Sequence, residues 1–208
     1  MARGMARPGF FHIDRSGVIR EEFFEGNELD RFTPNNVMGK LFPELAEGVS
    51  REVEAAHLRL RLAQSDRLAA PGNRLTLVAE IELPRGVHVY APQVQGYKPI
   101  QLAIEASPEF ALDRVVYPPP KVLYLEAIRE QVPVFEGKLH ITQDVTVTRS
   151  PDFVRSLGSG KTITIGGELH YQACDQEVCY PPTAVRVKWQ LSVMPLDRQR
   201  SPEAIQHK

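Results

Sequence analysis

The two cysteines of the chain, Cys174 and Cys179, are separated by four residues within the segment HYQACDQEVCYPP, residues 170–182. Two thiols at this spacing could form a structural disulfide, bind a metal ion, or open and close in exchange with another protein. A hairpin can bring such a pair within the roughly 4.4–6.8 Å between Cα atoms that a disulfide requires. The spacing therefore permits a covalent pair but leaves its chemistry open.

A structural disulfide across so short a loop would stabilise the fold by about 2–3 kcal/mol in the chain-entropy model. A domain of this size with many alternating strands hardly needs that contribution. A zinc site would require four ligands, and only His170 and His88 are candidates to join the two thiolates. Because no paired Cys-x2-Cys spacing is present, the sequence predicts no metal site and no other cofactor.

A redox pair needs one accessible thiolate and a neighbouring thiol that resolves the mixed disulfide. The acidic residues between the cysteines, Asp175 and Glu177, would raise a thiol pKa through their negative charge. This indicates a cysteine pair that accepts electrons slowly and depends on its partner protein, rather than a pair with a strongly nucleophilic thiolate. Tyr171, Tyr180 and the prolines at 181–182 could shield the sulfurs from other thiols. From spacing alone, the structural and the redox interpretation both remain open.

The elements that would position this pair are strands. Apolar residues alternate with polar ones along three segments, which indicates one buried and one solvated face. The apolar positions are Leu75, Leu77, Ala79, Ile81 and Leu83; Ile100, Leu102 and Ile104; and Val185, Val187, Trp189, Leu191 and Val193. Seven to nine strands at short spacing, with no convincing helix between them, predict an all-β fold, an immunoglobulin-like antiparallel β-sandwich.

Two segments of this sandwich have distinctive composition. Gly166 and Gly167 lie inside a strand pattern just before the cysteines and predict a β-bulge. Residues 116–134, which include three consecutive prolines, predict a long stiff loop crossing one end of the sandwich.

The first 48 residues differ from the rest. They predict a hairpin that turns at Ser16 and Gly17, then a helix with Thr33 as N-cap and Pro34 at its first position. One hairpin and one helix cannot bury enough apolar surface alone. They must lean on the sandwich, pair with another chain, or be poorly ordered. We therefore expect an appendage at 1–48, a sandwich at 49–196 and a flexible tail at 197–208.

Bulk composition excludes several functions. The chain has 208 residues and a net charge of −1. This argues against nucleic acid or an anionic membrane as its main partner, because both attract basic proteins. No apolar run reaches the roughly 18 residues of a membrane span, and no signal peptide is visible, which matters less if the chain is a fragment. Two cysteines are too few for a disulfide-built scaffold.

The segment YQACDQEVCYPP resembles the active-site segment of a known family, the N-terminal periplasmic domain of the thiol:disulfide interchange protein DsbD. Residues 86–102 and 123–141 are similar to two further segments of that family, and together the similarity covers residues from about 53 to 195. The family fold is an immunoglobulin-like sandwich, in agreement with the alternation of the strands.

The resemblance implies a thiol–disulfide oxidoreductase of the protein-disulfide reductase type, which takes electrons from a thioredoxin-like partner and passes them to an oxidised acceptor protein. Cys179 would form the mixed disulfide and Cys174 would resolve it. Tyr90 would lie beside the sulfurs, with His88 where the family has another tyrosine. Tyr117 is the nearest aromatic to the position of the family's shielding loop. The cysteine spacing is one residue shorter than in the best-known members, and the acidic-aromatic tip of the loop is missing.

Residues 10–41 resemble something different, the C-terminal end of a peroxiredoxin-like (AhpC/TSA) redoxin domain without its catalytic cysteine and central strands. A redoxin domain in the same full-length chain would be a partner at high effective concentration. These resemblances imply a periplasmic or otherwise extracytoplasmic protein. The alternative from another class is a non-catalytic sandwich that docks a redox protein and contains a structural disulfide.

Overall fold

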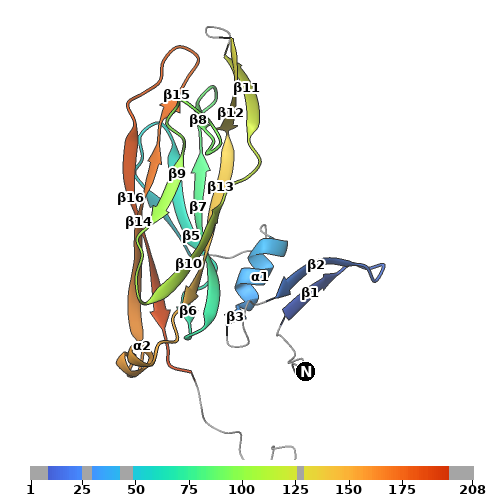
Figure 1. Ribbon diagram of the computed structural model, residues 1–208, viewed down its shortest axis with the longest axis vertical. Helices are drawn as coiled ribbons and strands as arrows, with labels where there is room; N and C mark the ends of the chain where they lie inside the picture. The colour runs from blue at the N-terminus through green and yellow to red at the C-terminus, as the bar shows by residue number, and fades with distance from the viewer. Residues whose placement is uncertain (1–8, 25–29, 43–48, 126–128, 197–208) are drawn as a thin grey trace, which may run out of the picture.

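The computed structural model describes residues 9–24, 30–42, 49–125 and 129–196, and strands dominate it (Figure 1). The expected flexible tail, residues 197–208, lies outside the described residues. Within the described part of the chain, no helix has the length and apolar character needed to cross a bilayer.

Two sheets form the body of the molecule. One has the strand order β10-β13-β7-β5-β4, with β3 added in parallel to β7, and the other has the order β6-β16-β14-β9. The first sheet consists of β3 (Arg31–Phe32), β4 (Val49–Val53), β5 (Arg59–Gln64), β7 (Asn73–Glu82), β10 (Phe110–Val116) and β13 (Lys138–Val147). The second consists of β6 (Leu68–Ala69), β9 (Gln101–Ile104), β14 (Lys161–Tyr171) and β16 (Thr183–Val193).

The core lies between these sheets and is filled by the alternating positions of their strands. Leu75, Leu77 and Ala79 on β7 are fully buried, as is Leu191 on β16. Trp189 packs in the same cluster, and its Nε1 donates a hydrogen bond to a backbone carbonyl of β5, 2.8 Å away. Because side chains alternate with period two, each strand contributes one face to this core. The predicted all-β, immunoglobulin-like sandwich is confirmed.

A third sheet caps one end of the sandwich, at the top of Figure 1. Its order is β11-β12-β8-β15, and its strands are β8 (His88–Tyr90), β11 (Lys121–Leu125), β12 (Glu130–Glu136) and β15 (Ala173–Cys174). The prediction of a long loop over residues 116–134 is therefore wrong, because all of β11 pairs with residues 130–134 of β12. The three prolines at 118–120 precede β11 and so do not interrupt its pairing.

The predicted bulge at Gly166 and Gly167 is also wrong. Strand β14 pairs with β16 from end to end without a shift in register. A Cβ atom at Gly167 would lie 2.4 Å from the carbonyl oxygen of Ala103 on β9. The glycine is needed because the neighbouring backbone approaches closely, the other common reason for glycine in a strand. A short helix that the sequence analysis missed, α2 (Pro151–Ser156), follows its N-cap Ser150.

The N-terminal hairpin and helix are both present. Strands β1 (Gly9–Ile13) and β2 (Ile19–Phe24) pair antiparallel, and α1 (Pro34–Leu41) begins after its N-cap Thr33. Helix α1 leans on the sandwich: Asn36 Nδ2 donates to Thr76 Oγ1 at 2.7 Å, and Thr33 Oγ1 donates to Asp66 at 2.7 Å. The β1–β2 hairpin extends away from the sandwich (Figure 1).

Candidate functional site

The two cysteines face each other across a short hairpin at the capped end of the sandwich. Tyr180 N donates to Ala173 O and Asp175 N to Val178 O, each at 2.9 Å, so Cys174 and Cys179 form the non-hydrogen-bonded pair between them. Side chains come closest at such pairs. The Cα atoms are 4.0 Å apart and the sulfurs are joined in a disulfide. Among the described residues, no group of three or more His, Cys, Asp or Glu side chains could hold a metal ion.

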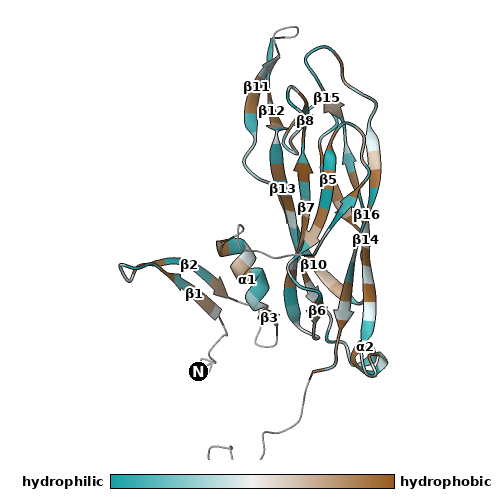
Figure 2. Cartoon of the chain, turned by 180° about the vertical axis from the view of Figure 1, so that it is seen from behind, coloured by the Kyte–Doolittle hydropathy of each residue, from teal (hydrophilic) through white to brown (hydrophobic). Residues whose placement is uncertain are grey.

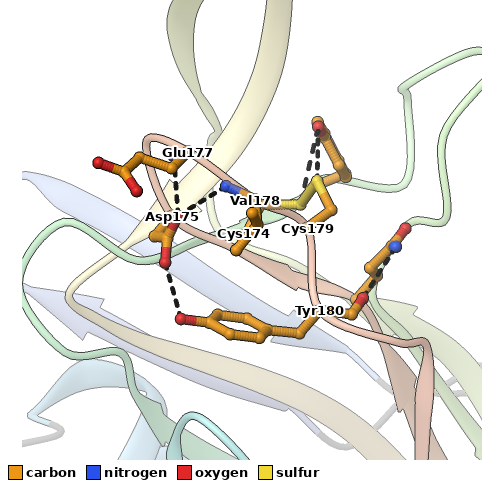
Figure 3. The surroundings of a disulfide bond; sticks show 8 residues. Cys174, Asp175, Glu177, Val178, Cys179 and Tyr180 are labelled. Carbon is orange, nitrogen blue, oxygen red and sulfur yellow. Dashed lines mark hydrogen bonds between the residues drawn. A yellow bond between two sulfur atoms is a disulfide. The ribbon is translucent and has the colours of Figure 1, made fainter.

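Asp175 organises the turn between the cysteines. Its Oδ1 accepts hydrogen bonds from the backbone N–H groups of Glu177 and Val178, both at 2.8 Å, and its Oδ2 accepts one from the Tyr180 hydroxyl at 2.7 Å (Figure 3). The Val178 N–H, the Tyr180 hydroxyl and the Glu177 N–H lower the pKa of Asp175 to about 2. The turn therefore holds a fixed negative charge at neutral pH, beside the sulfurs.

The two cysteines differ sharply in exposure. Cys174 is 1% exposed and packs with Tyr90, Val132 and Val134 in a small cluster of its own. Cys179 is exposed, together with the turn residues 176–178 that precede it. The disulfide therefore joins a buried residue to an exposed one.

Tyr90 on β8 covers the disulfide. Its hydroxyl lies 3.8 Å from Cys179 Sγ and 3.9 Å from Cys174 Sγ, and burial raises its pKa. The ring of Tyr97 stacks on the ring of Tyr90 with centroids 4.4 Å apart, and its hydroxyl donates to Glu130 at 2.7 Å. The sequence analysis missed Tyr97, although it lies in the segment 86–102 that had already been singled out.

His88 lies next to Cys174, because the two residues are direct partners across β8 and β15. The side chain is 4% exposed, and its ring packs edge-on to the ring of Tyr90 with centroids 5.5 Å apart. Its Nε2 has no hydrogen-bond partner among the described residues. Burial lowers the pKa of His88, while the negative charges of Glu136 and Asp175 oppose that shift.

The remaining aromatic residues of the predicted site make their hydrogen bonds elsewhere. The Tyr117 hydroxyl accepts from Leu102 N at 3.1 Å, and the Tyr171 hydroxyl donates to the Ala56 carbonyl at 2.7 Å; both rings pack against the main core. Tyr180 acts on the turn through Asp175. The tyrosine that the structure brings to the sulfurs is Tyr90, on a strand distant in sequence from both cysteines.

Comparison with known proteins points to one family. The family model described as "Thiol:disulfide interchange protein DsbD, N-terminal" matches residues 60–190. No curated protein sequence matches significantly. Among solved structures, the N-terminal periplasmic domain of ScsB from Proteus mirabilis is similar with 11% identity and a TM-score of 0.42, covering 74% of this chain. The chain spans only 53% of that ScsB structure. The reduced DsbD N-terminal domain of Neisseria meningitidis has 13% identity and a TM-score of 0.39, over 76% of this chain and 98% of that one.

Proposed function

This chain belongs to the family of DsbD N-terminal domains, whose role is thiol–disulfide exchange, and on that premise we propose that Cys174 and Cys179 are its working pair. In this proposal the chain is a protein-disulfide reductase. It takes two electrons from a thioredoxin-like partner and passes them to an oxidised acceptor protein.

The observation that supports this most strongly is the difference in exposure between the two cysteine residues, 1% for Cys174 against an exposed Cys179. A thiolate of the partner attacks Cys179 Sγ, the disulfide breaks, and Cys174 leaves as a thiolate that takes up a proton. The second thiol of the partner then attacks the mixed disulfide and releases Cys179. In the onward step Cys179 attacks the disulfide of the acceptor, and Cys174 displaces the acceptor thiolate by re-forming its bond with Cys179.

Titration of the pair against dithiothreitol and glutathione tests whether it exchanges at all. We expect a reduction potential between about −270 and −180 mV, the range spanned by thioredoxin and protein disulfide isomerase. A value below about −300 mV is typical of structural disulfides and would favour the alternative, a non-catalytic docking sandwich.

A trapping experiment tests the roles of the two sulfurs. The Cys174→Ala variant retains the exposed thiol. It should form a stable mixed disulfide with a thioredoxin that has one active-site cysteine, supplied as its nitrobenzoate mixed disulfide. The matched Cys179→Ala variant retains only the thiol of the buried residue. It should react at least about tenfold more slowly, because a thiolate must be accessible to attack the mixed disulfide of the thioredoxin. Equal trapping by both variants would contradict the assigned roles.

We also propose that the N-terminal segment belongs to a redoxin-like domain and that the protein works outside the cytoplasm. An apolar face of the β1–β2 hairpin supports the first point: Phe11 is 49% exposed and Phe24 44%. The stability of disulfides in oxidising compartments supports the second. Reduced chain should re-reduce an oxidised AhpC/TSA-type redoxin, and the Cys179→Ala variant should not. Absence of transfer by the unmodified chain would remove the redoxin as a partner and leave the thioredoxin-like donor.

A further inference from the structure

Three side chains with acid–base or thiol chemistry form one row across the capping sheet. Glu136 on β12 is the direct partner of His88 on β8, and His88 is the direct partner of Cys174 on β15. Direct partners on neighbouring antiparallel strands project from the same face, with Cβ atoms about 4.5–5.5 Å apart. The row therefore places a carboxylate, an imidazole and the buried sulfur of the disulfide side by side.

The imidazole in this row is buried and incompletely bonded. His88 is 4% exposed, yet its Nε2 has no partner among the described residues. A buried polar atom left without a partner costs free energy, so each such atom in a folded protein needs an explanation. In the oxidised state Cys174 has no proton to offer. After reduction its thiol does, and the two groups are neighbours.

We propose that His88 is the general base for the Cys174 thiol in the resolving step; this inference rests on the proposed function of the pair. When Cys179 is joined to another protein in a mixed disulfide, His88 Nε2 accepts the proton of the Cys174 thiol. The resulting thiolate attacks Cys179 Sγ, the intramolecular disulfide forms, and the other protein leaves as a thiolate. In the reverse direction the imidazolium returns its proton to the departing Cys174. No further oxidant or reductant is needed.

The burial of Cys174 is the reason that it needs such a base. A thiol buried in apolar surroundings has a raised pKa, and at 1% exposure Cys174 has little access to bulk water. The groups facing His88 are Glu136 from β12, Tyr90 from its own strand, and Cys174 and Asp175 from β15 and its turn. Lys121 on β11 pairs with Glu136 at 3.5 Å. Burial, the largest influence, lowers the pKa of His88, so the imidazole is neutral and able to accept a proton at neutral pH.

The test follows the reduced protein as it reacts with dithiobis-nitrobenzoate. Attack by Cys179 releases one nitrobenzoate thiolate, and resolution by Cys174 releases the second. In the unmodified chain we expect the second phase to be independent of pH near neutrality and to fall below the pKa of His88. In His88→Gln it should be at least about tenfold slower at neutral pH. It should also rise with pH by about tenfold per unit, because the thiolate fraction alone then sets the rate. The first phase should change less than about twofold.

Two further variants keep the test decisive. His140→Gln makes the same change at an exposed histidine on β13 and should leave both phases unchanged. Glu136→Gln removes a charge that raises the pKa of His88, so the fall in the second phase should move to lower pH. If His88→Gln does not fold, the shift of the pH profile in Glu136→Gln tests the role of His88.

An unchanged second phase in folded His88→Gln, equal slowing of both phases, or an unshifted profile in Glu136→Gln would each overturn the role of His88. Because the reagent is a small molecule, these phases do not depend on a protein partner. If both phases of nitrobenzoate release are as expected but the chain does not exchange disulfides with a thioredoxin-like protein, the proposed function is wrong and the role of His88 still stands.

Discussion

The chain contains two hairpins whose turns are built in the same way, β1–β2 near the N-terminus and the disulfide hairpin. In the first, Asp14 Oδ1 accepts from Ser16 N at 2.9 Å and Val18 N at 3.0 Å. In the second, Asp175 Oδ1 accepts from two backbone N–H groups in its own turn. Both carboxyl groups have a pKa lowered to about 2 by hydrogen bonds. Local turn chemistry is therefore shared.

The surroundings of the two hairpins differ. The first presents apolar side chains to solvent, including Phe11, Ile13 and Phe24, and β1 and β2 contain brown, hydrophobic segments in Figure 2. The second is joined to β8, and the Tyr90 hydroxyl lies 3.8 and 3.9 Å from its two sulfurs. Its residue Cys174 is buried and its residue Cys179 is exposed. An aspartate can shape a turn anywhere on a protein surface. The environment supplied by the capping sheet is what makes the second hairpin a candidate site.

The largest effect should come from removing the cover of the second hairpin. Tyr90→Ala deletes a ring that is 2% exposed and should lower the free energy of unfolding by about 3 kcal/mol. It should also accelerate alkylation of the reduced cysteines by iodoacetamide. Phe11→Ala, at a ring that is 49% exposed, should change the free energy of unfolding by less than about 0.5 kcal/mol. Denaturant titration and alkylation kinetics measure both.

Faster alkylation could also follow from a general loss of stability, so a matched destabilising variant is needed. Leu191→Ala removes a fully buried side chain on β16, in the main core rather than the sulfur cluster, and should cost about 2–5 kcal/mol. If it accelerates alkylation as much as Tyr90→Ala does, the cover assigned to Tyr90 is wrong.

A smaller effect should follow from removing the carboxylate of each turn. Asp175→Ala removes three hydrogen bonds beside the disulfide. It should lower the melting temperature and increase the rate of reduction by dithiothreitol by roughly threefold. The effect is modest because water replaces the lost partners, so each hydrogen bond contributes little net stability. Asp14→Ala should leave that rate unchanged, because its turn belongs to the projecting hairpin. Equal effects of the two changes on reduction would mean that the hairpins are coupled.

The smallest effect is a dependence on acid pH. The folded pKa of Asp175 lies below its ordinary value of 3.8, at about 2, so its contribution to stability is complete above the ordinary value. That contribution is lost as pH falls from about 4 towards about 2. Melting curves over this range should fall less steeply for Asp175→Asn than for the unmodified chain. For Asp14→Asn, the melting temperature of the sandwich should fall with pH as steeply as in the unmodified chain. A less steep fall would mean that the β1–β2 hairpin contributes to the stability of the sandwich.

Much of this structure follows from local physics, which the sequence contains in full. Period-two alternation identified the buried face of β7 and β16, because successive side chains of a strand point to opposite sides. Thr33 and Pro34 identified the start of α1, since each meets the needs of a first helical turn. The cysteine spacing permitted a disulfide but left its chemistry open, and the structure joins the two sulfurs.

Other features required residues that are distant in sequence. The proline-rich segment before β11 suggested a loop, but the neighbouring strand β8 completes a sheet there. Gly167 suggested a bulge, but the approach of β9 accounts for it. The family resemblance implied that Tyr90 lies beside the sulfurs, but spacing along the chain could not place it there, because Tyr90 is distant in sequence from both cysteines.

The sequence by itself determined the strands, the turns and the presence of a cysteine pair, because these depend on neighbours within a few residues. Only the tertiary structure decided which cysteine residue is buried and which groups lie next to it. Tyr90 stands 84 residues before Cys174, and burial is the sum of contacts made across such separations. The buried Cys174, the exposed Cys179 and the buried His88 Nε2, which has no hydrogen-bond partner in the described part of the chain, all arise from that packing.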